Sequence, residues 1–347
     1  MTSRLRILHC LSTREFAGTE RHLAELSAIQ ARSHDVTLLL ERRTTDARTG
    51  GDIQGFLCPD VKIVRAGRAG YLPALAAELR SGRHDIVHTH LGRASARASW
   101  LRRAGLAGSV PVVATLHTSY RGRSYGTHDG LVCIASWQRD VLPERQREAC
   151  ALIPNWTVPP HSTAACRAAL RERMRLEWRI PPEGGVVIGA AGRMVEEKNF
   201  QLLIKAWKQA GLRPETRLVL VGDGPERCAL QKAAQGRTDI LFTGYRTDMP
   251  DLLAAFDAFV VPSRHEPFGL VLLEAMEAGL PVCATAAGGV KDILADAPEC
   301  LLPSGCLEAL MAGLRRLEAA APRQWDMSRY RIATAASSVE AFYRRYC

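Results

Sequence analysis

Two glutamates, Glu266 and Glu274, flank the start of a predicted helix. The apolar run from Phe256 to Val261 has the length and composition of a buried parallel strand, and Pro262 ends it. Apolar residues then recur at helical spacing from Leu270 to Leu280. Carboxylates accept hydrogen bonds from sugar hydroxyls, and a helix N-terminus offers unpaired N–H groups to an anion. The spacing is typical either of a sugar-phosphate site or of an ordinary strand–loop–helix with two solvated glutamates.

A second group of candidate residues follows the predicted strand 186–191. Gly192 ends this strand, and Arg193 and Lys198 lie in the loop that leads into the next helix. Two cations beside a helix N-terminus favour diphosphate binding and would stabilise a departing phosphate as its charge develops. The alternative interpretation is that Lys198 is a solvated residue at the start of a helix.

Two further strand ends run into loops that contain glycine. Strand 218–221 leads into GDGPER, and strand 240–243 leads into GYRTD. Either loop would allow its backbone to approach a base or a ribose, although neither motif is specific by itself.

The first half of the chain contributes fewer candidates. Gly18 follows the first predicted strand, and His117 ends the strand VVATLH, where it would orient a sugar hydroxyl or transfer a proton. A structural role for His117 is the alternative. His84, His88 and His90 raise the question of zinc, but no further ligands follow at metal-like spacing. No Asp-x-Asp pair occurs, so no metal is expected.

Length and composition indicate a two-domain globular protein. The chain has 347 residues, of which 47% are hydrophobic, and no apolar run approaches the 18 residues of a membrane span. We expect no signal peptide. The 10 cysteines form no Cys-x-x-Cys pair, and Cys133 and Cys283 lie in strand-like runs, which favours free thiols in a reducing cytoplasm.

The net charge of +10 is concentrated in the first half. Residues 1–157 hold 22 Lys and Arg against 14 Asp and Glu, whereas the remainder holds 24 against 22. This asymmetry favours an anionic partner, such as a membrane surface, a phosphorylated glycan or nucleic acid, or it reflects arginines on solvated faces.

Strand and helix patterns alternate along the chain, which predicts parallel sheets covered by helices on both faces. Strands are predicted at 6–11, 36–40, 61–64, 85–90, 110–117, 130–135, 186–191, 218–221, 240–243, 258–261 and 282–284. The helices that bear on the outcome below are predicted at 20–32, 72–80, 95–104, 164–178 and 329–346. The Pro-rich segment 153–160 is the predicted linker. We expect two doubly wound α/β domains, 1–155 and 156–328, with ligands at the carboxyl ends of their strands.

These residues resemble the retaining glycosyltransferases of family 4, which have the GT-B fold. The resemblance covers nearly the whole chain and is strongest in its second half. The matching motifs, in the family's order, are Gly192-Arg193 with Glu197-Lys198-Asn199, Val221-Gly222-Asp223-Gly224-Pro225, Thr243-Gly244, Pro262-Ser263, Glu266 with Glu274, and Gly288-Gly289-Val290. The resemblance implies two Rossmann-like domains that face each other across a cleft, with a C-terminal helix, 329–347, that crosses back to the first domain.

The resemblance also implies roles for individual residues. Arg193 and Lys198 would hold the donor diphosphate, Glu266 would contact donor-sugar hydroxyls, and His117 would lie near the same sugar. These four are the predicted catalytic residues. The predicted donor-binding residues are Gly18, Gly192, Asp223, Gly224, Tyr245, Arg246, Phe268, Gly269, Leu270 and Glu274. Among them, Glu274 would bind the ribose and Arg246 would lie beside the base. Gly18 belongs to a loop that commonly has two glycines in the family, and in this chain alanine precedes Gly18.

The segment from His117 to Gly130 is shorter than in many family members. It contains Arg121 and Arg123, and we expect Arg93 and Arg97 at a neighbouring strand end. Our hypothesis is a shallow, basic acceptor face for an anionic glycan or glycolipid, such as a growing lipopolysaccharide core.

The predicted activity is the retaining, metal-independent transfer of a hexosyl or N-acetylhexosaminyl unit from a nucleotide sugar, by family frequency a UDP-sugar. No cofactor beyond this donor is expected, and the predicted location is the cytoplasm or the inner face of the inner membrane. The alternatives are a GT-B nucleotide-sugar epimerase and a non-catalytic protein that binds anionic glycans or nucleic acid. Nucleic acid is not an expected partner, because an aromatic content of 6% offers little for base stacking.

Overall fold

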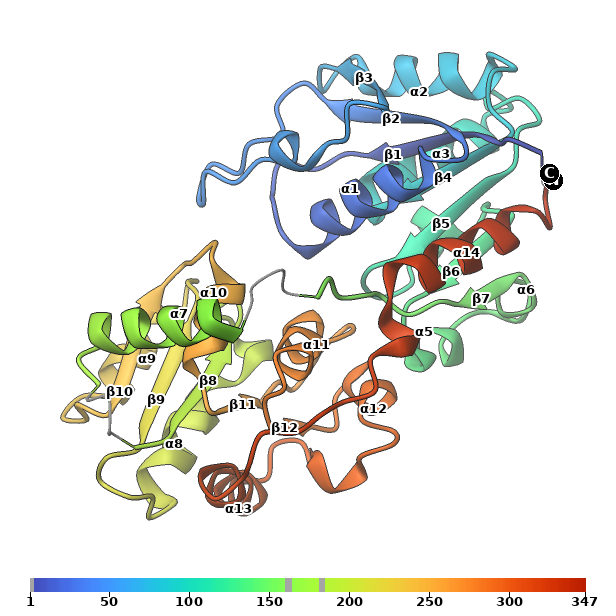
Figure 1. Ribbon diagram of the computed structural model, residues 1–347. Coiled ribbons are helices and arrows are strands. Elements are labelled where there is room, and N and C mark those ends of the chain that lie inside the picture. Colours follow the sequence, from blue (N-terminus) through green and yellow to red (C-terminus); the bar gives the residue numbers. More distant parts are fainter. Residues whose placement is uncertain (1–2, 160–163, 181–184) are drawn as a thin grey trace. The chain divides into compact units, whose positions relative to one another are not determined.

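The computed structural model describes residues 3–159, 164–180 and 185–347. The chain divides into two compact units, which Figure 1 colours by sequence. The first unit comprises residues 1–155 together with 329–347, and the second comprises residues 156–328.

The first unit is built on a seven-stranded parallel sheet with the order β3-β2-β1-β4-β5-β6-β7. Its strands are β1 (Arg6–Leu11), β2 (Asp35–Glu41), β3 (Lys62–Ala66), β4 (Ile86–His90), β5 (Val112–Leu116), β6 (Gly130–Cys133) and β7 (Cys150–Leu152). Its helices are α1 (Gly18–Gln30), α2 (Tyr71–Arg80), α3 (Leu91–Arg103), α4 (Gly122–Tyr125), α5 (Ser136–Asp140), α6 (Glu144–Glu148) and α14 (Ile332–Tyr343). All five residues of β4 and of β5 are buried, as expected for central parallel strands.

The two faces of this sheet have different chemistry. One face is apolar, where Leu8, Cys10 and Val87 pack against Tyr71 of α2 and Ala98 of α3. The other face carries histidines, which form hydrogen bonds with α1 and α14. Because side chains alternate along a strand, neighbouring positions of β1 and β4 supply both faces.

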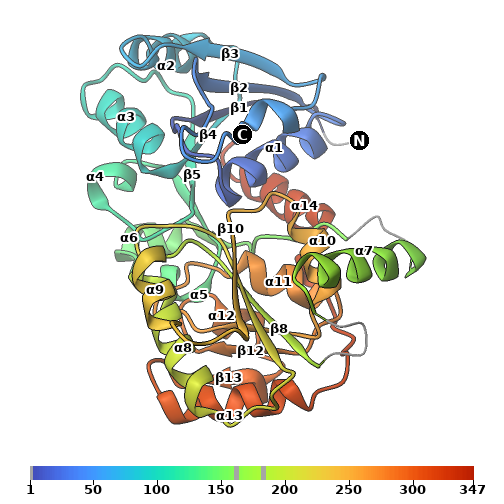
Figure 2. The same cartoon turned by 90° about the vertical axis from the view of Figure 1, so that its left-hand side faces the viewer.

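The second unit is built on a six-stranded parallel sheet with the order β10-β9-β8-β11-β12-β13. Its strands are β8 (Val187–Ala191), β9 (Arg217–Val221), β10 (Ile240–Gly244), β11 (Ala258–Val261), β12 (Val282–Thr285) and β13 (Leu301–Leu302). Its helices are α7 (Ala164–Glu177), α8 (Phe200–Gln209), α9 (Arg227–Ala233), α10 (Met249–Ala255), α11 (Leu270–Glu277), α12 (Val290–Ile293) and α13 (Leu307–Glu318). In Figure 2, α8 and α9 lie on one side of this sheet and α7, α10 and α11 on the other.

Aspartates at the amino ends of the strands hold neighbouring strands in place. Asp85 accepts a hydrogen bond from the N–H of Arg6 (2.7 Å), Asp129 from that of Val112 (2.7 Å), and Asp257 from that of Val187 (2.8 Å). Each carboxylate also pairs with an arginine. These three aspartates therefore have a structural role. They lie at the amino ends of the strands, whereas ligands of such sheets bind at the carboxyl ends.

The predicted fold class is confirmed, because both sheets are parallel and doubly wound. Several predicted element bounds differ from those of the structure. Helix α3 begins at Leu91 rather than Ser95, because its first buried residues are small and do not form a strong apolar repeat. Phe256 ends α10 instead of starting β11, and its ring stacks on Trp178 (5.7 Å between centroids). Strands β7 and β13 were not predicted, because three and two residues are too short for a recognisable pattern. The final helix is shorter than expected and follows a 3-10 turn, Ser328–Tyr330.

Two predictions about the chain as a whole can be compared with the structure. All ten cysteines are free thiols, and Cys133 and Cys283 are buried. Among the described residues, no helix combines the length and the apolar character that crossing a membrane requires.

Candidate active site

The carboxyl ends of β8 and β11 bring the predicted catalytic residues of the second unit together. The strand order changes direction between these two neighbours, so the loops that follow them leave on opposite faces of the sheet. Ligands of open α/β sheets bind at such a point. The loop after β8 contains Arg193 and Lys198, and the loop after β11 contains Glu266.

Lys198 and Glu266 form an ion pair. The Nζ of Lys198 lies 2.5 Å from Oε2 of Glu266, whose side chain is 8% exposed, and the hydroxyl of Ser263 lies 3.5 Å from the same oxygen. Asn199, in the left-handed conformation (φ 55°), donates a hydrogen bond to the carbonyl of Pro262 (3.3 Å) and so links the two loops. The two charged groups of the pair are largely removed from water. An incoming phosphate would therefore replace Glu266 as the partner of Lys198, and sugar hydroxyls would replace Lys198 as the partner of Glu266.

Arg193 differs from Lys198 because its side chain is exposed and has no hydrogen-bond or ion-pair partner in the part of the chain that the structure describes. A planar guanidinium that is not engaged suits bidentate binding of a phosphate. The site thus offers one paired and one unpaired cation.

The N-terminus of α11 lies in the same region. Gly269 precedes the helix with φ 114°, which a residue with a side chain rarely adopts. The backbone of Gly289 approaches that of Phe268 so closely that a Cβ on Gly289 would lie 2.7 Å from the Phe268 Cα. The Gly288-Gly289 turn therefore supports the loop that positions Glu266, whose carbonyl accepts a hydrogen bond from the Gly289 N–H (3.1 Å). Glu274 follows in the second turn of α11 and is partly buried.

The glycines of the β8 and β9 loops pack against each other. Gly222 has φ 132°, and a Cβ there would lie 2.0 Å from the carbonyl oxygen of Gly192. A Cβ on Gly224 would lie 2.4 Å from the carbonyl oxygen of Met194. Loop packing alone therefore requires these two glycines, whether or not a nucleotide also approaches them. The carboxylate of Asp223 pairs with Arg227 (3.1 Å), and its role in donor binding stays a prediction.

Tyr245 and Arg246, predicted near the base, occupy different environments. Tyr245 is 39% exposed, whereas the guanidinium of Arg246 contacts Asp248 (2.6 Å) and Glu177 of α7 (2.7 Å). Both carboxylates raise the pKa of Arg246 above its usual value. Arg246 therefore has a structural role that the sequence did not predict, because its partner Glu177 precedes it by 69 residues.

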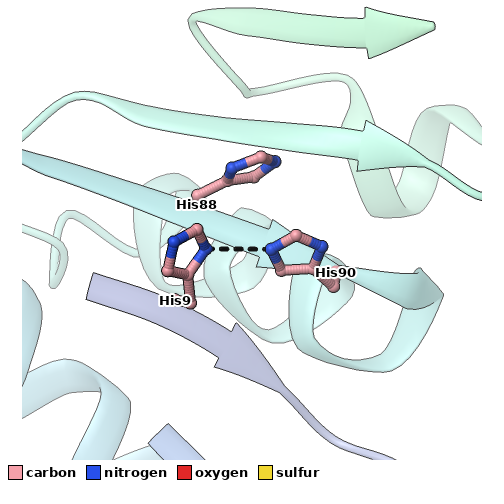
Figure 3. Close-up of side chains that lie close together, drawn as sticks. All are labelled: His9, His88 and His90. Atoms are coloured by element: carbon pink, nitrogen blue, oxygen red, sulfur yellow. Dashed lines mark hydrogen bonds between the residues drawn. The ribbon is translucent and has the colours of Figure 1, made fainter. Parts of the chain in front are cut away.

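In the first unit, His117 follows β5 and is almost completely buried. Its Nε2 lies 3.2 Å from Nδ1 of His90, whose Nε2 lies 3.0 Å from Nδ1 of His9. The edge of the His22 ring faces the His117 ring at 5.0 Å between centroids. Figure 3 shows the hydrogen bond between His9 and His90, with the ring of His88 beside them. Burial lowers the pKa of His117 to about 3, so this imidazole is neutral near pH 7.

The structure groups the histidines differently from the sequence. His84 pairs with Glu78 (2.7 Å), while His9 and His22, which the sequence analysis did not select, join His88, His90 and His117. The pairing of β1 with β4 was the available signal, because it places His9 directly opposite His88. Glu20 was also missed: this buried carboxylate caps α1 by accepting the Ala17 N–H (2.8 Å), and burial raises its pKa to about 7. Gly18 is the first residue of α1, and ligand contact there stays a prediction.

The four arginines of the predicted acceptor face are not equivalent. Arg93, in the first turn of α3, is exposed, as are Arg121 and Arg123 around the short helix α4. Arg97 instead contacts Ser12 (2.5 Å) and Glu41 (3.7 Å) and lies over the Tyr71 ring. Arg97 is therefore half-buried and engaged by a carboxylate of β2, unlike the other three, and its role on the acceptor side stays a prediction.

The basic helix α7 is also neutralised. Arg171 and Arg175 both pair with Asp257, and Arg173 pairs with Asp251 (3.1 Å). These ion pairs attach α7 to the amino end of β11 and to α10. They leave less positive charge on this helix than its sequence suggests.

The chain is similar in sequence to known proteins. Residues 16–156 match the family described as "Glycosyltransferase Family 4", and residues 185–319 match "Glycosyl transferases group 1". A 2-deoxystreptamine N-acetyl-D-glucosaminyltransferase from Streptomyces fradiae is 31% identical over 82% of this chain and 73% of its own length. The lipopolysaccharide core biosynthesis glycosyltransferase LpsD from Rhizobium meliloti is 35% identical, over 52% of this chain and 48% of that protein. The match to a 2-deoxystreptamine glucosyltransferase from Streptomyces kanamyceticus spans about half of each chain, 56% and 54%.

Solved structures agree on the fold. Anabaena HepE in complex with UDP and glucose has a TM-score of 0.69 and 20% identity, over 99% of this chain and 95% of that one. WaaG, a glycosyltransferase involved in lipopolysaccharide biosynthesis, has a TM-score of 0.66 and 20% identity, over 98% and 95%. Two doubly wound units with these neighbours define the GT-B fold, and the family matches together with the Streptomyces fradiae relative make the chain a glycosyltransferase of this class. More particularly, the chain belongs to glycosyltransferase family 4.

Proposed function

We propose that this glycosyltransferase moves a sugar from a UDP-sugar to a hydroxyl of an anionic glycan or glycolipid, with retention at the anomeric carbon, in lipopolysaccharide core or surface polysaccharide assembly. The single observation that supports the donor half of this proposal is the Lys198–Glu266 pair beside the exposed Arg193 at the turning point of the second sheet. HepE, which shares the fold, has been solved with UDP and glucose. LpsD, a relative, is named for lipopolysaccharide core biosynthesis.

In this proposal the two cations act on the leaving group. Arg193 and Lys198 bind the donor diphosphate, and the N-terminus of α11 adds backbone N–H groups as negative charge develops. Glu266 releases Lys198 to the phosphate and accepts hydrogen bonds from sugar hydroxyls, while Glu274 binds the ribose. The acceptor hydroxyl attacks on the face that the diphosphate leaves, and the departing phosphate oxygen takes its proton. No protein nucleophile and no metal are required.

The donor prediction concerns Glu274. We expect purified protein to release one nucleotide slowly from one member of a panel of UDP-, GDP- and ADP-sugars without added metal. Glu274→Ala should raise the KM for that donor about tenfold or more, because hydrogen bonds to a charged group contribute roughly 1.5–3 kcal/mol. Nucleotide release is measured by a coupled assay.

The control for this experiment is Glu277→Ala, which removes a carboxylate from the same helix one turn later. It should leave the donor KM unchanged. If no donor is hydrolysed and calorimetry detects no binding of UDP, GDP or ADP, the donor half of the proposal is wrong.

The acceptor prediction concerns the exposed arginines around α4. Replacing Arg121 and Arg123 together with alanine should raise the KM for an anionic acceptor up to about thirtyfold, because each of the two exposed ion pairs contributes at most about 1 kcal/mol. Hydrolysis of the donor in the absence of acceptor should not change. A double change of Arg139 and Arg145 to alanine removes the same charge from α5 and α6 and is the matched control. Equal effects of the two double variants would contradict a localised acceptor face.

The two alternative functions are a nucleotide-sugar epimerase and a non-catalytic binding protein. Neither gains support from the relatives named above, which are all glycosyltransferases. Peripheral contact with the inner face of a membrane is part of the proposal only through its glycolipid acceptor. Sedimentation with vesicles that contain anionic lipid tests that contact separately from turnover.

A further inference from the structure

The part of the first unit that contains β4, α3, β5 and α4 has an unbalanced charge. Residues 86–128 contain six arginines and neither aspartate nor glutamate. Among the described residues, carboxylates from outside this stretch engage two of the six, since Arg97 contacts Glu41 and Arg102 pairs with Asp129. The other four have no carboxylate partner there, and all of them are exposed: Arg93, Arg103, Arg121 and Arg123.

The packing of α4 against α3 gathers these four arginines on one surface. The hydroxyl of Ser99 in α3 donates a hydrogen bond to the carbonyl of Ser124 in α4 (2.7 Å). The guanidinium of Arg103 donates to the carbonyls of Gly122 (3.2 Å) and Arg123 (3.3 Å). Figure 2 shows α4 beside α3. The arginines around α4 therefore lie next to those of α3.

The outer side of α3 also carries an exposed tryptophan. Trp100 is 52% exposed and lies seven residues after Arg93 and three before Arg103, so the three side chains share one side of the helix. Leu106 follows the helix and is 40% exposed. In the part of the chain that the structure describes, the indole has no hydrogen-bond or ring partner. Packing on the sheet does not account for Trp100, because Ala98 and its buried neighbours form the inner side of α3.

Arginines around an exposed indole match the surface of an anionic bilayer. Anionic headgroups attract basic side chains, and each one near such a surface contributes roughly fivefold to the affinity. Indole rings are enriched at the membrane–water boundary, where the ring meets apolar groups and its N–H stays hydrated. Stable attachment combines an apolar group with a basic cluster. Trp100 and Leu106 supply the apolar groups, and the four arginines supply the basic cluster.

The apolar side chains favour a bilayer over a soluble anion. A soluble phosphorylated compound would be bound through the cations and would leave Leu106 in water. A bilayer adds the burial of apolar surface to the attraction between charges. Trp100 projects from the outer side of α3, away from the sheet, and a planar surface that meets this side meets the neighbouring arginines as well.

We propose that the outer side of α3 and the adjoining α4 dock on an anionic lipid bilayer, with Trp100 and Leu106 at the headgroup boundary and the arginines on lipid phosphates. We call this surface the α3–α4 face; its residues are Arg93, Trp100, Arg103, Leu106, Arg121 and Arg123. The contact needs neither donor nor acceptor. It goes beyond the proposed function, in which the glycolipid acceptor alone connects the enzyme with a membrane.

The first test measures the partition of the purified protein onto vesicles without any sugar nucleotide. We expect sedimentation with vesicles of equal parts phosphatidylglycerol and phosphatidylcholine, but not with phosphatidylcholine alone, and added salt should weaken the binding. Trp100→Ala should lower the partition coefficient about fivefold or more, because the apolar area of the indole is lost. Arg93→Ala should lower it roughly fivefold. Absence of binding to the anionic vesicles would overturn the proposal.

Matched controls remove the same kinds of group elsewhere on the first unit. Phe56→Ala removes an aromatic ring that is 49% exposed, and Arg145→Ala removes an exposed arginine of α6. Neither control should change the partition coefficient. All four side chains are exposed, so we expect every variant to fold, which thermal denaturation verifies. Controls with effects as large as those of Trp100→Ala and Arg93→Ala would contradict a localised docking face.

The second test asks whether Trp100 itself reaches the bilayer. Lipids with bromine on their acyl chains quench the fluorescence of indoles at the membrane boundary. The chain has six tryptophans, and we expect the quenching of the wild type to be lost in Trp100→Phe. Equal quenching in both proteins would place a different tryptophan at the bilayer and would overturn the proposal.

Heparin, a soluble polyanion, provides the competing outcome. If Arg93→Ala weakens heparin binding while brominated lipid fails to quench Trp100, the α3–α4 face binds a soluble anionic glycan and docking on a bilayer is wrong. Quenching of Trp100 together with the loss of partition in Arg93→Ala supports the bilayer.

Failure of this inference is distinguishable from failure of the proposed function. Glu274→Ala, which should impair use of the donor, should bind the anionic vesicles as the wild type does. Trp100→Ala should retain the slow hydrolysis of the donor without acceptor. Nucleotide release without vesicle binding would overturn the docking face alone, whereas vesicle binding without nucleotide release or nucleotide binding would overturn the donor half alone.

Discussion

Replacing Lys198 with methionine is expected to lower kcat/KM for glycosyl transfer at least a hundredfold. The cation lies at the turning point of the second sheet and would stabilise the departing diphosphate. Removing one such preorganised group typically costs about 2.7–4 kcal/mol of transition-state stabilisation, or roughly 10²- to 10³-fold in rate. Steady-state kinetics with the cognate donor measures the effect. Lys205→Met, which removes an exposed lysine from α8, is the control and should retain wild-type activity.

The same substitution should also reveal the structural half of the ion pair. Lys198→Met leaves Glu266, 8% exposed, without its cation, and breaking a buried pair on one side costs about 3–5 kcal/mol. The double variant Lys198→Met/Glu266→Gln removes both charges and should recover most of the stability, measured by thermal or urea denaturation, but none of the activity. If stability and activity recover together, Lys198 acts through folding alone and the phosphate-binding role is wrong.

The second large effect is an acid-induced loss of stability confined to the first unit. Seven histidines there are buried, and six of them bear on this effect: His9, His22, His88, His90, His117 and His128. Burial lowers the pKa of each one, with values of about 4 for His9 and about 3 for His117 and His128. The only described histidine of the second unit, His265, is exposed.

The direction of the pH effect follows from these depressed values. Between pH 6.5 and the folded-state pKa, the unfolded chain binds protons that the folded chain does not, so stability falls as the pH falls through this window. A histidine that stays neutral in the folded state at pH 5 costs about 2 kcal/mol relative to an unfolded-state pKa of about 6.5. Glu20 acts in the opposite direction, because burial raises its pKa to about 7, but it is one group against six.

Hydrogen exchange measured by mass spectrometry at pH 7.5, 6 and 5, corrected for the intrinsic exchange rate, resolves the two units. The free energy of opening derived from amide exchange should fall by several kcal/mol in β1, β4 and β5 between pH 7.5 and pH 5. In β8, β9 and β11 it should change little. Uniform loss of protection in both units would show that other groups dominate. A pH-independent first unit would mean that the histidine cluster is protonated or hydrated in the native state.

The sequence predicted the second unit in most detail. Lys198, Glu266 and the glycine motifs follow strands of ordinary length, and each motif is contiguous, so that a local pattern is sufficient to find it. The same holds for the buried strands β4, β5 and β11, whose apolar runs reflect coverage on both faces. The roles of Asp223, Gly224, Phe268 and Leu270 in donor binding remain predictions. The kinetic experiment on Glu274→Ala addresses the role of Glu274.

Local patterns did not predict the partners of charged and polar groups. Arg97 faces Glu41 and Arg246 faces Glu177, because strand order and helix packing bring together residues 56 and 69 positions apart. The arginines of α7 appeared as a basic surface until their pairing with Asp251 and Asp257 was seen. Whether a charged side chain is solvated or neutralised depends on its neighbours in space. The number of charged residues in a segment of the sequence does not identify those neighbours.

The chain by itself determined which segments become strands and helices, that the sheets are parallel, and which strand ends carry glycines, cations and carboxylates. These properties depend on short-range sterics and on the periodicity of apolar residues. The tertiary structure alone decided that His9, His90 and His117 form one hydrogen-bonded chain and that Lys198 meets Glu266. Both outcomes depend on strand order: β1 lies beside β4, and β8 lies beside β11. Strand order is set by the packing of the whole sheet, in which long-range contacts outweigh any local preference.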